Sequence, residues 1–282
     1  MAGKQVTELD ALPSFTDNSL LPVHNGTGLK KGLLSQLASY LGTKFSNPNL
    51  LINPDFKINQ RGATSYEKQG YSVDRWKIWN VTVTPSASGG ITVKNDKYED
   101  TGTFIQILEN ATEGDSTLSC YVESVSGTVT MVADDDSQVI LKQGLNIVHT
   151  SRSTKSFTIF LNQGTSITLK WVKLEQGKVA TSFIAPNHAE ELVKCKRYYN
   201  FSVLHFYGVC NSIGSLNEDL VLYRHFRTPP TFSTNATYSK NVTVSTLALK
   251  GSNDGGYYLY VRTPTSGTYE LDLTINADAE IY

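Results

Sequence analysis

The feature that most constrains the fold is a long succession of short segments in which apolar and polar side chains alternate, with almost no helical periodicity among them. Alternation with a period of two is typical of half-buried β-strands, and the glycines between these segments are typical of turns. The chain is therefore expected to be all-β over most of its length. The expected strands of the central part cover 74–83, 91–94, 103–109, 117–123, 127–133, 138–141, 145–149, 156–161 and 166–175.

Two segments bracket this central part. The run from Asn49 to Phe56 is apolar and then breaks into Asn-Pro-Asp, as a strand does where it enters a turn. The closing segment alternates, and this alternation places Ile167, Leu169 and Trp171 on one face, which we expect to be buried. We therefore predict one β-sandwich over residues 47–185.

Residues 1–46 are predicted to be an attachment segment of short extended pieces followed by a helix. Gly42 stands where a C-terminal cap belongs. A helix of this length is marginal alone, so it must dock either on its own domain or on other chains, and we favour other chains. The apolar residues at helical spacing, expected to serve attachment or oligomerisation, are Leu33, Leu34, Leu37, Tyr40 and Leu41.

Residues 186–199 are predicted to be a linker helix, and residues 200–282 a second β-domain. Asn187 is a suitable N-cap with Glu190 three residues later, and Arg197 lies in the last turn, a polarity that suits the helix dipole. The expected strands of the second domain lie near 201–209, 219–226, 242–248, 256–262 and 268–276.

Composition and charge exclude several classes of function. Lys plus Arg (25) nearly cancels Asp plus Glu (26), so no uniform basic field would recruit nucleic acid. The chain opens with no signal-peptide pattern, and no apolar run approaches the roughly 20 residues that span a bilayer. We expect synthesis in a cytoplasm, no membrane insertion and no nucleic-acid partner. The three cysteines, expected to be buried thiols, are Cys120, Cys195 and Cys210.

Several short motifs occur in a fixed order along most of the chain. Through them the chain resembles the phage tail-fibre and virion-fibre proteins that carry a carbohydrate-binding-module-like jelly roll. At the N-terminus, Leu20–Val23, Thr27 and Lys30-Lys31 ahead of the Leu-rich helix look like the anchor of such fibres. The other motifs are Asn49–Phe56, Gln60–Gly62, Asp74–Trp76, Trp171–Gly177, Ala180–Phe183, Ala189–Leu192, Cys195–Tyr199, Arg227–Thr231 and Ala277–Glu280.

This resemblance implies a structural virion appendage, usually trimeric, that displays β-domains toward a host surface. The expected partners are two further copies in a homotrimer, other virion proteins at the N-terminal segment and a host-surface glycan. No cofactor is expected, and the protein would reside in the virion. Residues expected to line a three-fold seam are Phe201, His205, Tyr207, Tyr223, His225 and Phe226.

Aromatic residues are the candidate ligand contacts, because sugar rings stack their C–H faces on aromatic rings. Trp76 and Trp79, three apart in one expected strand, point to opposite faces, so that one is core and Trp79 is a possible platform. Tyr66 and Tyr71, in the polar loop before that strand, are possible ligand contacts as well. The alternative for all of them is packing.

Metal ligation and catalysis have weaker signals. Asp134 to Asp136 could supply oxygens to calcium, although a solvated turn explains them too, and Asp55 and Glu175 are candidates by position. Glu109, Glu113 and Asp115 could pair for glycoside hydrolysis, as any acidic loop could. No catalytic motif is present. Two alternatives to the adhesive fibre stay open: a purely structural collar or decoration subunit, and a carbohydrate-active enzyme or its binding module.

Overall fold

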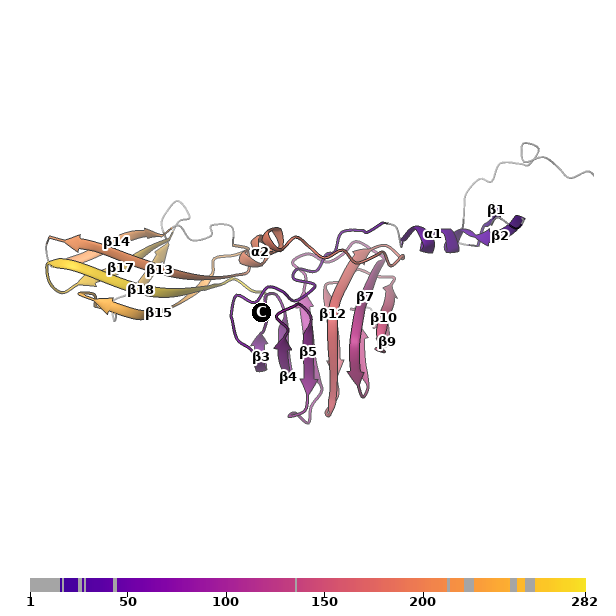
Figure 1. Ribbon diagram of the computed structural model, residues 1–282, viewed down its shortest axis with the longest axis horizontal. Helices are drawn as coiled ribbons and strands as arrows, with labels where there is room; N and C mark the ends of the chain where they lie inside the picture. The colour runs from indigo at the N-terminus through magenta and orange to yellow at the C-terminus, as the bar shows by residue number, and fades with distance from the viewer. Residues whose placement is uncertain are drawn as a thin grey trace, which may run out of the picture.

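The computed structural model describes residues 16, 18–24, 27, 29–42, 45–134, 136–211, 214–220, 226–243, 248–251 and 257–282. These residues form an N-terminal hairpin and helix, a central β-sandwich and a C-terminal β-domain, which follow one another along the long axis of the molecule (Figure 1). The predicted all-β fold class, with few helices, is confirmed. Within the described part of the chain, neither helix has the length and apolar character needed to cross a membrane.

The N-terminal part is a small hairpin that leads directly into a helix. Strands β1 (Leu20–His24) and β2 (Leu29–Leu33) pair antiparallel, and α1 (Leu34–Gly42) follows. The predicted helix therefore exists, but Leu33 ends the preceding strand, and Gly42 is the last helical residue, not the cap beyond it. Residues 1–15 of the predicted attachment segment lie outside the described residues.

The central sandwich contains ten strands, and hydrogen bonds join nine of them along one continuous path. The order is β10-β7-β12-β5-β4-β6-β11-β8-β9, with β3 paired to β4. Strand β4 joins the two layers, because its first half pairs with β6 and its second half with β5. The bounds are β3 (Tyr66–Tyr71), β4 (Lys77–Pro85), β5 (Ile91–Asn95), β6 (Gly102–Ile107), β7 (Ser116–Ser126), β8 (Val129–Val132), β9 (Gln138–Ile140), β10 (Gly144–Thr150), β11 (Ser156–Leu161) and β12 (Thr165–Gln176).

One apolar core fills the space between the two layers, with aromatic rings at its centre. The ring of Trp76 stacks on Phe104 at 4.6 Å between centroids and meets the edge of Phe157 at 5.9 Å. Trp76 is fully buried, as predicted for one of the two tryptophans. It lies just before β4 and not within it, so its orientation is set by the 72–76 turn.

The expected bracketing of the sandwich is visible in its hydrogen bonds. The segment that begins at Asn49 runs beside β12, where the Leu50 N–H donates to the Leu174 carbonyl (2.8 Å) and the Asn49 amide donates to the Val172 carbonyl (3.0 Å). This segment pairs with the sandwich without itself forming a regular strand.

The prediction for Trp171 is wrong, because β12 contains a bulge. Its register with β7 shifts on both sides of Leu169, so Lys170 has no partner in the ladder. An extra residue reverses the alternation beyond it. Ile167 and Leu169 are buried as expected, whereas Trp171 lies half-buried on the opposite, outer face.

The linker helix α2 (His188–Lys196) forms as predicted, because its signals are local. The Asn187 side chain caps it by accepting hydrogen bonds from the backbone N–H groups of Ala189 (2.9 Å) and Glu190 (3.3 Å). Glu191, in the first turn of α2, is buried and accepts a hydrogen bond from the Asn53 N–H (2.6 Å). This bond docks the helix on the sandwich.

The C-terminal domain consists of two three-stranded antiparallel sheets, β13-β18-β15 and β14-β17-β16. Its described core is formed by Leu271, Leu273 and Ile275 of β18. Residues 221–225 and 244–247, within predicted strands, lie outside the described residues. The bounds are β13 (Tyr199–Cys210), β14 (Gly214–Leu220), β15 (Thr231–Lys240), β16 (Ala248–Gly251), β17 (Tyr257–Thr263) and β18 (Gly267–Asp278).

A buried ion pair joins the sandwich to the end of the C-terminal domain. Arg75 donates to the Glu280 carboxylate at 2.6 Å, and both side chains are almost fully buried. The Arg75 guanidinium also lies 3.7 Å from the centre of the Tyr198 ring. Arg227 donates to the carbonyls of Ala279 and Glu280 (both 3.2 Å), so the last residues of the chain are held from both sides. We call this set of contacts the junction clamp.

The three cysteines are buried and free, as predicted. Burial raises the pKa of the Cys120 thiol to about 12 and raises that of Cys195 further.

Candidate ligand-binding surface

The two tyrosines predicted to contact a ligand are occupied by internal contacts. They lie on β3, an edge strand where the sequence suggested a loop, and β3 pairs with β4 through its backbone. The Tyr66 hydroxyl donates to the Asn59 side chain, and the Tyr71 hydroxyl donates to the Ile281 carbonyl at the domain junction. Burial raises the pKa of Tyr71 to about 12. Both therefore serve local structure.

Trp79 is the exposed member of the predicted set. It lies on β4 between Gln69 of β3 and Thr103 of β6, and 47% of its surface is exposed. The described residues include no aromatic ring in contact with it. It remains a single platform on the outer surface of the sandwich.

A larger aromatic cluster lies on the outer face of β10, β7 and β12, where the bulge has turned Trp171 outward. The Phe183 ring stacks on Trp171 at 4.7 Å with an interplanar angle of 2°. Tyr121, the ladder partner of Trp171 on β7, lies 6.2 Å away at a tilt of 33°. Leu145 and Ile147 of β10 extend the surface, and both are exposed. We call these five residues the aromatic face.

The segment 177–185, which carries Phe183, is fixed across the sheet by buried charges. Lys173 and Glu175 point to the same outer side as Trp171 and form an ion pair at 3.1 Å, nearly without exposure. Lys173 Nζ donates to Thr181 Oγ1 (2.6 Å) and the Ser182 carbonyl (3.1 Å), while the Thr181 N–H donates to Glu175 (2.9 Å). These bonds hold the 177–185 strap, and with it the Phe183 ring, in one position.

Two cavities flank the stacked rings. One, of about 360 Å³, lies between the strap and β10, and it is lined by Ser119, Leu145 and Ile147 as well as the two rings. The Ser119 side chain is almost fully buried, and its hydroxyl has no hydrogen-bond partner among the described residues. An unpaired buried hydroxyl is costly, and Ser119 lines this cavity, so a polar group that reached this hydroxyl would remove that cost.

The second cavity, of about 520 Å³, lies on the other side of the same rings. Charged side chains surround it, namely Asp55, Lys57, Glu123 and Lys170. Asp55 and Lys57 form an ion pair at 2.9 Å. The aromatic face thus combines flat apolar rings with hydroxyl, carboxylate and ammonium groups at its rim, which is the chemistry that recognises a polyhydroxylated ring.

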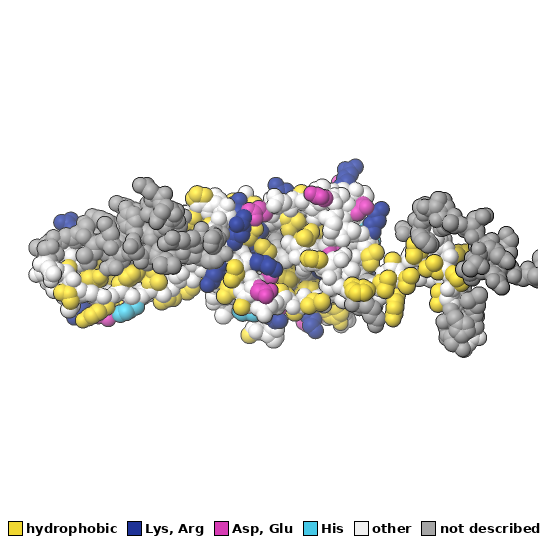
Figure 2. Space-filling view, turned by 90° about the horizontal axis from the view of Figure 1, so that it is seen from above, with side chains coloured by type: hydrophobic (Ala, Val, Ile, Leu, Met, Phe, Trp, Pro, Cys, Tyr) yellow, Lys and Arg dark blue, Asp and Glu magenta, His cyan; other side chains and the backbone are white. Residues whose placement is uncertain are grey.

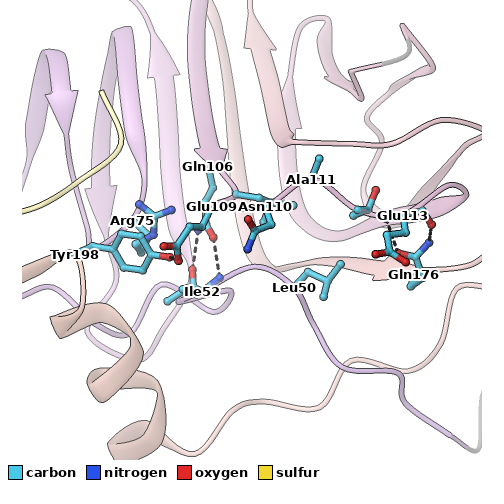
Figure 3. Close-up of a pocket in the computed structure, with 12 residues that line it drawn as sticks. Leu50, Ile52, Arg75, Gln106, Glu109, Asn110, Ala111, Glu113, Gln176 and Tyr198 are labelled. Carbon is cyan, nitrogen blue, oxygen red and sulfur yellow. Dashed lines mark hydrogen bonds between the residues drawn. The ribbon is translucent and has the colours of Figure 1, made fainter. Parts of the chain in front are cut away.

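A third cavity, of about 340 Å³, lies beside the junction clamp (Figure 3). Two of its amide groups are used by the protein: the Gln106 side chain bonds both the N–H and the carbonyl of Ile52 (2.7 Å each), and Gln176 bonds the backbone of Glu113. Glu109 accepts bonds from Arg197 (2.7 Å) and Tyr198 (3.1 Å), and the bond from Arg197 lowers its pKa. These contacts make this groove part of the joint between the domains.

The candidate metal ligands are engaged elsewhere. Asp134 accepts bonds from the N–H and hydroxyl of Ser156 (2.9 and 2.5 Å), as a turn residue does, and Asp135 lies outside the described residues. Both oxygens of Glu175 accept from Thr181, and Asp55 pairs with Lys57. In the part of the chain that the structure describes, three His, Cys, Asp or Glu side chains nowhere gather as a metal site.

Sequence reasoning missed most of the aromatic face. Tyr121 alternates with the buried Leu118, Cys120 and Val122, so the strand pattern could have placed it outside. The same alternation places Ser119 outside, although the strap then buries it. Phe183 carried no such signal, because the strap is positioned by tertiary contacts.

No family model matches the chain, and no curated protein matches it. Among solved structures, a variant of the family 29 carbohydrate-binding module CBM29-2 aligns with 44% of this chain and 100% of its own, at 12% identity and a TM-score of 0.30. The enzymatically active domain of tailspike protein 4 of bacteriophage CBA120 aligns with 45% of this chain and 21% of its own (12% identity, TM-score 0.27). Discoidin II of Dictyostelium discoideum aligns with 70% of this chain and 84% of its own (13% identity, TM-score 0.24). These TM-scores are low, and the fold is therefore described from this chain's own strands.

Proposed function

We propose that this chain is a structural subunit of a phage virion fibre that displays β-domains for adhesion to glycans on a host surface. The observation that carries the adhesive part is the aromatic face, where a rigid pair of stacked rings borders a cavity lined by Ser119, whose buried hydroxyl has no hydrogen-bond partner among the described residues. The apolar side chains of α1 are exposed to solvent in the single chain. Because binding to other chains would bury them, their exposure supports an attachment role.

The proposed mechanism is multivalent. In a homotrimer, three weak sites would be linked at a fixed spacing, and linkage raises the overall avidity above the affinity of one site. The protein would transform no substrate. Glu109, a sequence candidate for glycosidase chemistry, has its pKa lowered by the hydrogen bond from Arg197, which does not suit the role of general acid.

The adhesive part is tested by glycan-array binding of the full chain, followed by calorimetry with the strongest hit. We expect Tyr121→Ala and Ser119→Ala each to weaken binding about 5- to 10-fold, since about 1 to 1.4 kcal/mol of contact is lost. Trp79→Ala is the matched control and should leave the affinity unchanged. A loss with Trp79→Ala alone would move the site to β4, and the absence of any glycan hit would favour the purely structural collar or decoration subunit.

The virion part has its own test. Immunogold labelling of purified particles with an antibody against the C-terminal domain should decorate slender appendages. Label on the particle shell or collar would replace the adhesive fibre with a decoration role, and unlabelled particles would refute the virion assignment.

A further inference from the structure

The C-terminal domain presents an apolar stripe along one edge of a sheet. Strand β13 is twelve residues long and is one of the two edge strands in the order β13-β18-β15. Its outward side chains follow the strand period, and the four apolar ones are strongly exposed: Phe201 40%, Val203 68%, Tyr207 66% and Val209 64%. His205 lies at the centre of the row. We call these five residues the β13 stripe.

Among the described residues, β13 pairs on one side only, and an exposed apolar edge strand of this kind is unusual. Proteins protect edge strands with charges, prolines or bulges, since an edge offers unpaired backbone groups to other chains. The β13 stripe has none of these devices: it pairs with β18 without a register shift, and its five side chains include no Lys, Arg, Asp or Glu. His205 bonds to Asp272 on the neighbouring strand, so its polar end is satisfied within the chain.

The dimensions of the stripe indicate that it is part of a larger interface. Twelve residues at about 3.3 Å each give a strip about 40 Å long, and two strand spacings make it about 10 Å wide, or about 400 Å². A stable interface covers about 800 Å² on each partner. Further area is therefore required, and the described chain offers it at its other end, where Leu37, Tyr40 and Leu41 of α1 are exposed.

We propose that the β13 stripe packs against the same stripe of other copies of this chain, side by side and pointing in the same direction. In the molecule, α1 and the C-terminal domain lie at opposite ends of the long axis, with the sandwich between them (Figure 1). Figure 2 shows apolar side chains at both of these ends on the face that it views. Parallel copies bring α1 to α1 and β13 to β13 at once, whereas antiparallel copies joined at β13 leave their α1 helices far apart and uncovered.

This inference rests on the proposed function in one respect, namely that the N-terminal attachment segments of all copies lie together. It is tested by thiol cross-linking of the full chain. In Val203→Cys, a short bis-maleimide should link residue 203 of one copy to residue 203 of the next, because a parallel arrangement brings identical positions together. The natural cysteines are buried, so the unmodified chain gives the background.

Ser126→Cys, exposed at the end of β7 in the sandwich, is the control and should not cross-link. A second variant, Val203→Asp with Tyr207→Lys, should lower the mass measured by light scattering while the circular dichroism spectrum stays unchanged. Calorimetry on that variant keeps the two proposals apart, since affinity for glycan at each site should persist if the aromatic face is correct.

Two results would overturn the proposal. A chain that is monomeric at every concentration would mean that the stripe is free or covered by a different protein. A multimer in which Val203→Cys fails to cross-link, while the double variant Val203→Cys with Tyr207→Cys succeeds, would indicate antiparallel copies.

Discussion

At the scale of single residues, Asp74 is the group most able to make stability depend on pH. Its carboxylate is buried and accepts bonds from the backbone and side-chain amides of Gln60. Burial dominates over these bonds and raises its pKa to about 6, from the ordinary 3.8. The folded chain therefore binds this proton more tightly than the unfolded chain does.

The sign of the effect follows directly. A raised folded-state pKa means that Asp74 contributes stability when protonated, and that this contribution is lost as the pH rises through about 6. Lowering the pH from 7.5 to 5 should raise the free energy of unfolding by about 1 kcal/mol through this group. Urea titrations of the wild type and Asp74→Asn at both pH values measure the difference, and parallel pH dependences would contradict it.

The three tryptophans show how far the burial of a single residue could be predicted from the sequence. One of Trp76 and Trp79 was expected in the core and the other outside, and the structure agrees. Trp171 was placed wrongly because a bulge at Lys170 shifts the period by one residue. A bulge depends on the partner strand, which the sequence of β12 alone does not specify.

At the scale of elements, the 177–185 strap depends on one hydroxyl that bonds two buried charges. Thr181→Val preserves the shape of the side chain but removes an acceptor for Lys173 and a donor to Glu175. Hydrogen bonds to charged groups are worth about 1.5 to 3 kcal/mol, so we expect a loss of about 2 to 3 kcal/mol in the free energy of unfolding.

Thr168→Val is the control for this element, because the Thr168 hydroxyl bonds only the hydroxyl of Thr92 at 3.1 Å among the described residues. It should cost about 1 kcal/mol or less. Denaturant unfolding measures both variants. Equal losses would mean that the charges of the strap are solvated and that the strap does not rely on Thr181.

The elements that were predicted best are those with local signals. Helix α2 has its cap and its charge polarity within its own residues. Strands β3 and β15 were missed because their side chains are mostly polar, and they are held by backbone pairing with β4 and β18. Such edge strands have no apolar alternation to detect, since little of their surface is buried.

At the scale of the whole molecule, the chain works as a rod only if its two β-domains are rigidly joined. The junction clamp supplies this joint with a buried ion pair, the Arg75 guanidinium over Tyr198, and the bonds from Arg227 to the end of the chain. Adhesion at the sandwich and assembly at β13 would then be held at a constant spacing. The segments that contain Arg75 and Glu280 stood out in the sequence, but nothing in the sequence predicted that these two side chains form an ion pair.

The clamp makes a final prediction about the molecule as a unit. Glu280→Ala leaves the buried Arg75 without its partner, and breaking a buried pair in this way costs about 3 to 5 kcal/mol. The cost falls on the joint, because each domain keeps its own core. Thermal unfolding should therefore separate into two transitions, and small-angle scattering should report a broader range of overall lengths.

Arg75→Met combined with Glu280→Leu removes both charges and should recover much of the stability, since an apolar pair needs no compensation in a buried site. A single unfolding transition and unchanged scattering for Glu280→Ala would mean that the other contacts hold the domains together without this ion pair.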